Sequence, residues 1–522
     1  MDERYHNQNK YFTDNYLQIV SILLIVISGI LVFFFWNSHH GFNVPDEGYL
    51  WYGSQRVMLG EVPFPDFMSY DIGRYYWSAA FMRLVGDNGI ITLRVAIMVF
   101  QILALCVAFL VLVRNTAAQS LFFWLLVFIT LLVWMFPQYK IFDASLSIIL
   151  ISSLSFLLEQ PSRRRYFLAG LIVGLVAVFG RNHGLYGAIG NISVMLYLVM
   201  KRENAPNLIA AFSFWLLGVV VGYLPVLFFL IFVPGFAPAF WESIRAMLFE
   251  IKATNISLPV PWPWLLPFER MTTVEILRNV TVRLFPIAVV IFGVLGIVWA
   301  IRQRLQKKKV SPVLIAAIFL ALPYAHYTYS RADLEHTALG VFPFLIGIFV
   351  LLASQSAKIK WSFVALLCGM SILIMLPYHP AWLSKQHINI KVAGDKLKVD
   401  LYTAHRLKLC EELAIRFAPF DQTFVAMPYS PGIYAALGRK CPMWEIYALL
   451  PRSASFQQAE IERIKAANPG FAIIDNFPID WRDDLRYSKT HPIIDRYIRD
   501  NFERLNDLAQ NPAIYRSKHI EK

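Results

Sequence analysis

Charged residues are scarce in this sequence of 522 residues, and several familiar signals are missing. Only 16% of the residues are Asp, Glu, Lys or Arg, while 57% are hydrophobic. Because a soluble domain carries about a quarter charged residues, this balance excludes an ordinary soluble protein. The four cysteines form no CxxC pair and no Cys/His spacing typical of a metal site. The first apolar run is too long for a signal-peptide core and lacks a cleavage site, so we expect a retained helix.

A basic stripe for nucleic acid is also missing, although the net charge is +13. The basic residues cluster in short loops between apolar segments, as the positive-inside rule predicts for a membrane protein. No soluble region combines basic residues with interleaved aromatic side chains, so we expect no nucleic-acid partner. The sequence also lacks the matched halves with interrupted helices that many secondary transporters show.

Long apolar runs recur along most of the chain and predict a polytopic α-helical membrane protein with about eleven transmembrane helices. The stretch 166–200 would be roughly 52 Å long as one helix, too long for one crossing, so it is interpreted as two short helices that meet near Arg181, Asn182 and His183. The expected spans are residues 17–36, 90–113, 121–136, 144–158, 166–179, 185–200, 208–233, 284–301, 312–325, 337–353 and 361–377.

The basic loops predict the orientation of the spans. With eleven crossings these loops fall on one side together with the N-terminal tail, which is therefore expected in the cytoplasm. Two large loops, 37–89 and 234–283, then lie outside. We divide the chain into a membrane domain, 1–378, and a small extracytoplasmic α/β domain, 379–522.

Short apolar runs at 424–427 and 471–474 predict buried strands in the C-terminal domain, and 454–466 predicts a helix. Cys410 and Cys441 lie in the same domain. In an oxidising compartment they could form a disulfide, and the sequence leaves open whether they are paired or free.

Unusual ionisable residues gather near the outer ends of the expected spans. Such groups at membrane depth are costly and usually face a cavity or a partner. Acids and bases from several loops at one level therefore predict a shared site. The candidates are Asp46 and Glu47 after the first span, Arg74 later in that loop, Lys140, Asp143, Arg181, His183, Arg331, Asp333 and His336.

Each candidate also has a plainer interpretation. Asp46 and Glu47 could be ordinary loop residues in water, and Asp143 could only cap the helix that follows it. Lys140 and Arg331 could be anchors whose charged ends reach the membrane surface. The acid at position 333 could simply form an ion pair with the arginine at position 331 and have no other role. As a functional set, a carboxylate can take a proton from an acceptor hydroxyl, and Arg or Lys can neutralise a leaving phosphate.

The run VPDEGYLWYGSQRVMLGEVPFPDF, at residues 44–67, places an Asp-Glu pair directly after the first span, and Asp143 heads the fourth. This pattern resembles the GT-C membrane glycosyltransferases, in particular the glycosyltransferase 39/83 branch with protein O-mannosyltransferases and aminoarabinose transferases. The resemblance covers residues 17–377. It implies that Asp46 acts as general base or orients the acceptor, with Glu47 as its partner. It assigns Asp143 to the substrate, and outer basic residues such as Lys140 to the lipid phosphate.

The resemblance further implies transfer of a hexosyl or pentosyl group, with inversion, from a polyprenyl-phosphate carrier to a glycolipid, polysaccharide or protein. It implies a bacterial inner membrane with a periplasmic C-terminal domain. It leaves a divalent metal open, although the sequence itself contains no metal cluster. Two rival functions remain. A lipid or glycan transporter or flippase would need no general base, and an assembly scaffold would depend on the C-terminal domain alone.

Overall fold

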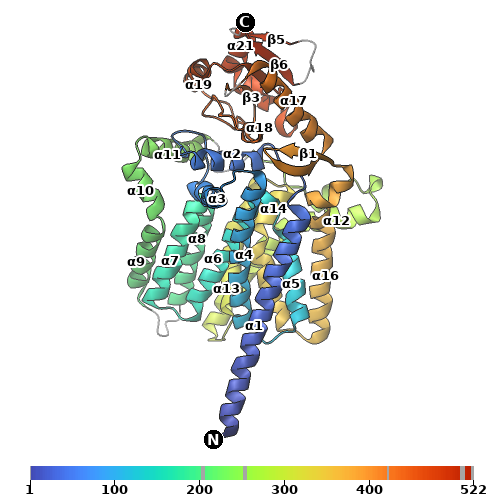
Figure 1. Cartoon of the computed structure of the whole chain (residues 1–522). Coiled ribbons are helices and arrows are strands. Elements are labelled where there is room, and N and C mark those ends of the chain that lie inside the picture. The colour runs from blue at the N-terminus through green and yellow to red at the C-terminus, as the bar shows by residue number, and fades with distance from the viewer. Residues whose placement is uncertain (1, 201–205, 251–255, 420–421, 506–511, 519–522) are drawn as a thin grey trace. The chain divides into compact units, whose positions relative to one another are not determined.

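The computed structural model describes residues 2–200, 206–250, 256–419, 422–505 and 512–518 (Figure 1). Contacts divide the chain into two units. The first contains Met1–Asn37 and Ile97–Trp382, and the second contains Ser38–Ala96 and Leu383–Lys522. The first large loop therefore belongs with the C-terminal part of the chain, not with the helices on either side of it.

The first unit is a bundle of apolar helices (Figure 1). Each of the expected spans falls on a helix or on a bent pair of helices. These helices are α1 (Asp2–Asn37), α4 (Ile90–Asn115), α5 (Leu121–Trp134), α6 (Ile141–Glu159), α7 (Arg163–Phe179), α8 (Arg181–Val199), α9 (Leu208–Gly222), α10 (Leu224–Phe232), α12 (Thr273–Leu305), α13 (Pro312–Ser330), α14 (Leu334–Gly340), α15 (Phe342–Ala353) and α16 (Ala357–Met375).

Among the described residues, six helices are long and apolar enough to cross a bilayer, or eight if each bent pair is one span. The pair α9 and α10 is bent by 57°, and the pair α14 and α15 by 52°. A proline lies in the first turn of α10 and of α15, where it removes a backbone hydrogen bond to the preceding helix. The chain is thus a multi-pass membrane protein, and the number of eleven crossings stays a prediction.

The stretch 166–200 is two helices, as predicted. Gly180 has an extended backbone (φ −167°, ψ 104°) that ends α7, and α8 begins at Arg181. The two helices pack against each other. Because of this break, the polar residues that begin α8 lie beside the last residues of α7, at one end of the helix bundle.

Helices α7 and α9 lie side by side and approach very closely (Figure 1). Gly170 and Gly174 on α7 face Gly218 and Gly222 on α9. A Cβ atom added at Gly170 would lie 1.9 Å from the carbonyl oxygen of Trp215. Small residues spaced by four let membrane helices approach in this way, because packing and not the hydrophobic effect holds helices together in lipid.

In the described part of the second large loop that precedes α12, the regular helix is α11 (Phe236–Arg245), followed by the π-helical turn Ala246–Glu250. In its described Pro/Trp-rich half, from 256 to 271, the backbone forms only two short 3₁₀ turns, Pro263–Leu265 and Phe268–Arg270. This agrees with the expectation that prolines prevent a regular helix there. A capping box of Thr272 and Glu275 then starts α12.

The first large loop forms two helices in the second unit, α2 (Asp46–Met58) and α3 (Ile72–Val85). The N-terminal half of α2 packs directly on α18 (Pro431–Leu437), since a Cβ atom on Gly48 would lie 2.4 Å from the backbone of Gly432. The amide of Gly432 also donates to the carbonyl of Val44 (3.0 Å). The start of α2 is therefore fixed by the C-terminal part of the chain.

The C-terminal part combines helices with two small sheets. The hairpin of β1 (Ile388–Val392) and β2 (Asp395–Val399) turns at Ala393 and Gly394, which both have positive φ. In the second sheet, of order β3-β4-β6-β5, β3 (Val425–Met427) is parallel to β4 (Phe471–Ile474), while β6 (Ala513–Ser517) is antiparallel to β4 and to β5 (Phe502–Arg504). The predicted strands β3 and β4 are confirmed.

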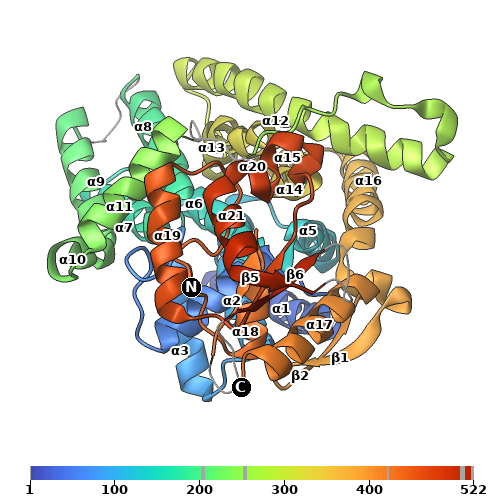
Figure 2. The ribbon, with the colours of Figure 1, turned by 90° about the horizontal axis from the view of Figure 1, so that it is seen from above.

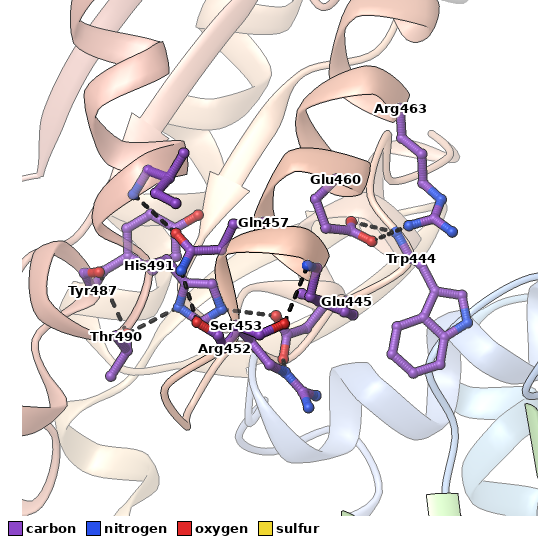
Figure 3. A network of polar contacts seen from close by, with 12 residues as sticks. Trp444, Glu445, Arg452, Ser453, Gln457, Glu460, Arg463, Tyr487, Thr490 and His491 are labelled. Carbon is purple, nitrogen blue, oxygen red and sulfur yellow. Dashed lines mark hydrogen bonds and ion pairs between the residues drawn. The ribbon is translucent and has the colours of Figure 1, made fainter. Parts of the chain in front are cut away.

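The helices of this part are α17 (Leu401–Phe417), α18, α19 (Ala454–Ala467), α20 (Tyr487–Thr490) and α21 (Pro492–Asn501), and α19 matches the helix predicted at 454–466. Helices α19 and α21 lie side by side (Figure 2). Residues of α19 and α20 and of the loops before α19 and α21 form a network of polar contacts (Figure 3). There Glu445 accepts from His491 (2.8 Å) and from Arg452 (2.6 Å).

Candidate active site

Asp46 begins helix α2 and is held from two sides. Its amide donates to Oδ1 of Asn43 (2.7 Å), and its own Oδ1 accepts from the hydroxyl of Tyr447 (2.7 Å). Burial and the nearby Asp46 carboxylate both raise the pKa of Tyr447, so this phenol stays protonated and donates. Asp46 is half-buried, so part of the residue remains accessible. A fixed, accessible carboxylate of this kind can accept a proton from a substrate hydroxyl.

Arg74 and Asp71 lie in the same neighbourhood as Asp46. The exposed phenol of Tyr70 is within electrostatic reach of all three charged groups. The ring of Tyr70 also packs on Tyr49 of helix α2, with centroids 4.9 Å apart. This region therefore brings one cation and two carboxylates around an aromatic surface.

Both carboxylate oxygens of Glu47 take part in a buried ion pair. Its two oxygens accept from Nε and Nη2 of Arg94, both at 2.8 Å, and each side chain is only 3% exposed. Arg94 also donates to the backbone carbonyls of Ser38, His40 and Gly41. This pair anchors the start of the loop to the first turn of α4. The buried ion pair leaves the carboxylate of Glu47 little freedom to react.

Asp143 is in the first turn of α6 and belongs to a buried cluster in the helix bundle. Its Oδ1 lies 2.8 Å from Nε2 of His183, at the start of α8, which is wholly buried. Nδ1 of His183 lies 2.7 Å from the hydroxyl of Tyr324, and Nε2 lies 2.9 Å from that of Tyr327. The side chain of Asp143 does not serve only as a helix cap, because it binds a histidine from another helix.

Aromatic residues extend this cluster along α13. The hydroxyl of Tyr186 lies 2.6 Å from Nδ1 of His326, and its ring packs on those of Tyr324 and Tyr327. Side chains from the starts of α6 and α8 and the end of α13 thus meet at one end of the bundle. Of the predicted site residues, this cluster brings together Asp143 and His183.

Lys140, in the short 3₁₀ turn Gln138–Lys140 before α6, reaches α14. Its ammonium group lies 3.3 Å from Oε2 of Glu335, which also accepts from Tyr139 (3.1 Å). The Lys140 side chain is 19% exposed and that of Glu335 is 36% exposed. Because this ion pair is accessible, an incoming phosphate can compete with Glu335 for the lysine.

Asp333 organises the turn between α13 and α14. It caps α14 by accepting from the amide of His336 (2.8 Å), and it accepts from Nδ1 of His336 (2.7 Å) and Nε of Arg331 (2.8 Å). Burial alone would raise the pKa of Asp333, but the bonds from His336 and the charge of nearby Lys140 outweigh it and lower the pKa to about 2. The predicted pairing of Arg331 with Asp333 is confirmed, and Arg331 also donates to the carbonyl of Ile256 (3.0 Å).

Arg181, at the first position of α8, contacts a different element. Its Nη1 donates to Oγ of Ser243 on α11 (2.8 Å), and its guanidinium lies 5.7 Å from the ring centroid of Phe240. Arg181 therefore fixes the helix of the second large loop, while remaining close in sequence to His183.

A metal centre is not formed by the described residues, since no three His, Cys, Asp or Glu side chains among them are arranged to hold an ion. Cys410 and Cys441 are both buried free thiols, so the structure favours the unpaired alternative. Burial raises the pKa of each thiol to about 12.

The sequence missed several partners in these clusters. Arg94 is hidden inside an apolar span, and Tyr447 lies 401 positions from Asp46. Tyr324, Tyr327 and the nearby His326 had looked like ordinary helix residues. A polar or aromatic cluster at one end of a span, as at residues 324–329, is the signal that could have found the last group.

Comparisons with known proteins bear on the fold. No family model and no curated protein matches the sequence. The structure is similar to that of ArnT from Cupriavidus metallidurans in the apo state (TM-score 0.52, 15% identity, 97% of this chain and 98% of that chain). It is also similar to the same protein bound to undecaprenyl phosphate (TM-score 0.51, 12% identity, 96% and 97%). A third match is the Archaeoglobus fulgidus oligosaccharyltransferase in the apo form (TM-score 0.50, 12% identity, 97% and 75%).

Proposed function

We propose that this chain, which has the fold of the GT-C glycosyltransferases, transfers a sugar from a polyprenyl-phosphate carrier to an acceptor in the cell envelope. The observation that carries the proposal is the Asp46 carboxylate, half-buried and oriented by Tyr447. A transporter of the same lipid would have no need of such a group. The binding of undecaprenyl phosphate by ArnT, whose fold is similar along the whole chain, supports the choice of carrier.

In the proposed reaction Asp46 takes the proton from an acceptor hydroxyl as the hydroxyl oxygen attacks the anomeric carbon of the carrier-bound sugar. The bond between that carbon and the phosphate oxygen breaks, and the polyprenyl phosphate leaves with the bonding electrons. Attack opposite the leaving group inverts the anomeric centre. The proton on Asp46 then passes to water. Each step uses the hydroxyl, the donor and one carboxylate, and needs no further reactant.

Basic residues are assigned to the carrier phosphate. Lys140, Arg331 and Arg74 supply positive charge that neutralises the leaving phosphate, and Arg181 holds the helix of the second large loop. Asp143 and His183 are assigned to substrate binding, because together they offer hydrogen-bond donors and acceptors. Glu47 positions the base through its pair with Arg94.

The remaining assignments rest on the basic loops of the sequence and on the resemblance given above. We assign the protein to a bacterial inner membrane with a cytoplasmic N-terminus and with residues 379–522 as a periplasmic domain. The acceptor is a glycolipid, a polysaccharide or a protein, and the transferred group is a hexose or a pentose. Should a divalent metal take part, it would add positive charge at the departing phosphate.

The test uses full-length protein in lipid nanodiscs with a panel of polyprenyl-phosphate sugars and an envelope extract as acceptor. Acceptor-dependent release of free polyprenyl phosphate is expected for one donor class. Movement of the intact donor across a vesicle membrane without release, unchanged by Asp46→Asn, would instead identify a transporter.

A further inference from the structure

A cavity of about 370 Å³ opens beside the start of helix α2, within the second unit. It is formed by the segment before α2, the first two turns of α17 and the loops that follow β3 and β4. Both acidic and basic groups line it together with aromatic rings. The lining residues include Pro45, Tyr402, Arg406, Tyr429, Asp475 and Phe477.

Arg406 is the basic residue that lines this cavity. Its side chain is only 7% exposed and forms an ion pair with Asp475, while Nη2 donates to Oγ of Ser430 (3.3 Å). Its buried Nη1 has no hydrogen-bond partner among the described residues. A buried donor without a partner is costly, and native proteins nearly always satisfy it. Because Nη1 itself is buried, a ligand oxygen in the cavity would reach it only after the guanidinium shifts toward the cavity.

The acidic groups indicate that the ligand is not an anion. Asp475 and Asp400 both line the cavity, and Arg406 already forms an ion pair with Asp475. The oxygens of Asp400 already accept from the amide (2.9 Å) and hydroxyl (2.7 Å) of Thr403. A phosphate or carboxylate would be repelled by these acids. A neutral ligand with several hydroxyl groups can donate to a carboxylate and accept from Arg406 at the same time.

Aromatic rings form the walls. Tyr429 and Phe477 pack edge to face with centroids 5.8 Å apart, and Tyr402 is 68% exposed. Aromatic faces bind the apolar C–H face of a sugar ring while its hydroxyl groups reach polar side chains. An amphipathic, ring-sized ligand therefore fits the chemistry of the whole cavity.

Asp46 does not line the cavity, but it lies close to residues that do. Pro45 lines it, and the next residue is Asp46. From another side, the ring of Tyr429 packs on that of Tyr447 (5.6 Å), whose hydroxyl binds Asp46. A sugar in the cavity thus lies one residue or one side-chain contact away from Asp46, which is proposed to activate the acceptor.

We propose that this cavity is a saccharide subsite that binds a neutral sugar residue of the acceptor, beside the hydroxyl that reacts. The acceptor is then a glycan, either lipid-linked or free, and not a bare peptide. This inference rests on the proposed function for its role in catalysis, but the binding itself can be measured without turnover.

The binding experiment uses full-length protein in nanodiscs. The probe is a mixture of neutral oligosaccharides made by acid hydrolysis and dephosphorylation of envelope lipopolysaccharide, with inorganic phosphate as the anionic comparison. Saturation-transfer NMR should detect the oligosaccharides, and phosphate should not displace them. Displacement by phosphate, or no binding to the wild type, would overturn the proposal.

Two variants locate the site. Arg406→Lys keeps a cation opposite Asp475 but loses the planar fork, and should weaken binding about tenfold or more. Tyr402→Ala changes an exposed residue that the fold does not need, and should weaken binding about threefold or more. Arg416→Lys, on the exposed side of the same helix α17, is the matched control and should bind as the wild type does. Wild-type affinity in Tyr402→Ala and in a folded Arg406→Lys protein would overturn the proposal.

Kinetics separate this inference from the proposed function. Both cavity variants should raise the acceptor KM and leave the donor KM unchanged, whereas a raised donor KM would assign the cavity to the carrier-bound sugar and contradict our proposal. Asp46→Asn should keep oligosaccharide binding and lose release of polyprenyl phosphate. If the wild type binds oligosaccharide but releases no carrier phosphate from any donor, the proposed function fails while the saccharide site stands.

Discussion

The hydroxyl of Tyr447 donates a 2.7 Å hydrogen bond to Asp46, a residue 401 positions earlier in the chain. The bond ties the first turn of α2 to the C-terminal part of the protein. It also fixes the direction of the carboxylate that is proposed to accept a proton. The long first loop and the C-terminal segment are therefore parts of one site.

Removing this hydroxyl should lower turnover without unfolding the protein. In Tyr447→Phe the ring still packs on Tyr49 and Tyr429, but Asp46 loses a donor that orients it. We expect kcat to fall about tenfold with little change in the donor KM. Steady-state release of polyprenyl phosphate measures this. Tyr497→Phe, on α21, is the control, and an equal loss in both variants would contradict a specific role.

The Glu47–Arg94 pair should matter for stability. Both side chains are 3% exposed, so removing one partner leaves a buried charge without compensation. Arg94→Met should cost about 3–5 kcal/mol of stability. The double change with Glu47→Gln should cost less than the sum of the single changes. Thermal unfolding of the full-length protein in detergent measures both effects.

The control for this pair is Arg482→Met, which breaks an exposed pair with Asp484 and should change stability by less than about 1 kcal/mol. If Arg94→Met unfolds no more readily than Arg482→Met, the pair does not anchor the loop.

Lys140 should contribute to affinity for the carrier. Its ammonium group is held by Glu335 in an accessible pair and can turn to a phosphate. Lys140→Met should weaken inhibition by free undecaprenyl phosphate about tenfold. Lys360→Met, which removes a lysine bound to Gln119, is the matched control and should leave inhibition unchanged. Equal inhibition of the two variants would remove Lys140 from the carrier site.

The lowered pKa of Asp333 predicts how the stability of the fold changes with pH. Its pKa of about 2 lies below the ordinary value of 3.8, so its ionised form stabilises the fold by about 2 kcal/mol. This contribution is complete above the ordinary pKa and is lost as the pH falls through 3.8 toward 2. The wild type should thus exceed Asp333→Asn in Tm at neutral pH, and the gap should narrow below about pH 4. A gap that is constant with pH would contradict this.

Cys410 and Cys441 should be unreactive in the folded protein. Both are buried free thiols, and burial raises the pKa of each to about 12, so little thiolate forms near neutral pH. With Cys106 and Cys368 replaced by serine, maleimide should label neither thiol in the native state. In denaturant without reductant it should label both. Labelling that requires a reductant would instead reveal a disulfide.

Local patterns in the sequence predicted much of the fold. The apolar runs marked each helix of the bundle, the length of 166–200 divided it into two helices near Arg181, and short apolar runs located β3 and β4. These features depend on residues close together in the chain. The bends between α9 and α10 and between α14 and α15 were not predicted, although Pro225 and Pro343 lie at those positions.

The candidate site was predicted only in part, because ion pairs join distant residues. Asp46 and Asp143 were identified from their positions near span ends. The partner of Glu47 is Arg94, in a span that seemed wholly apolar, and the partner of Asp143 is His183, from a different helix. A carboxylate looks the same in sequence whether it faces a substrate, caps a helix or binds a histidine. Tertiary contacts distinguish these roles.

The most direct test of Asp46 as the catalytic base is the release of polyprenyl phosphate by full-length Asp46→Asn in nanodiscs, with the active donor and an envelope acceptor. The asparagine keeps the size of the side chain and an oxygen for Tyr447 but cannot accept the proton. Release should fall about a hundredfold or more, while Asp66→Asn, an exposed carboxylate in the same loop, should retain wild-type release. Wild-type release by folded Asp46→Asn would show that Asp46 is not the base.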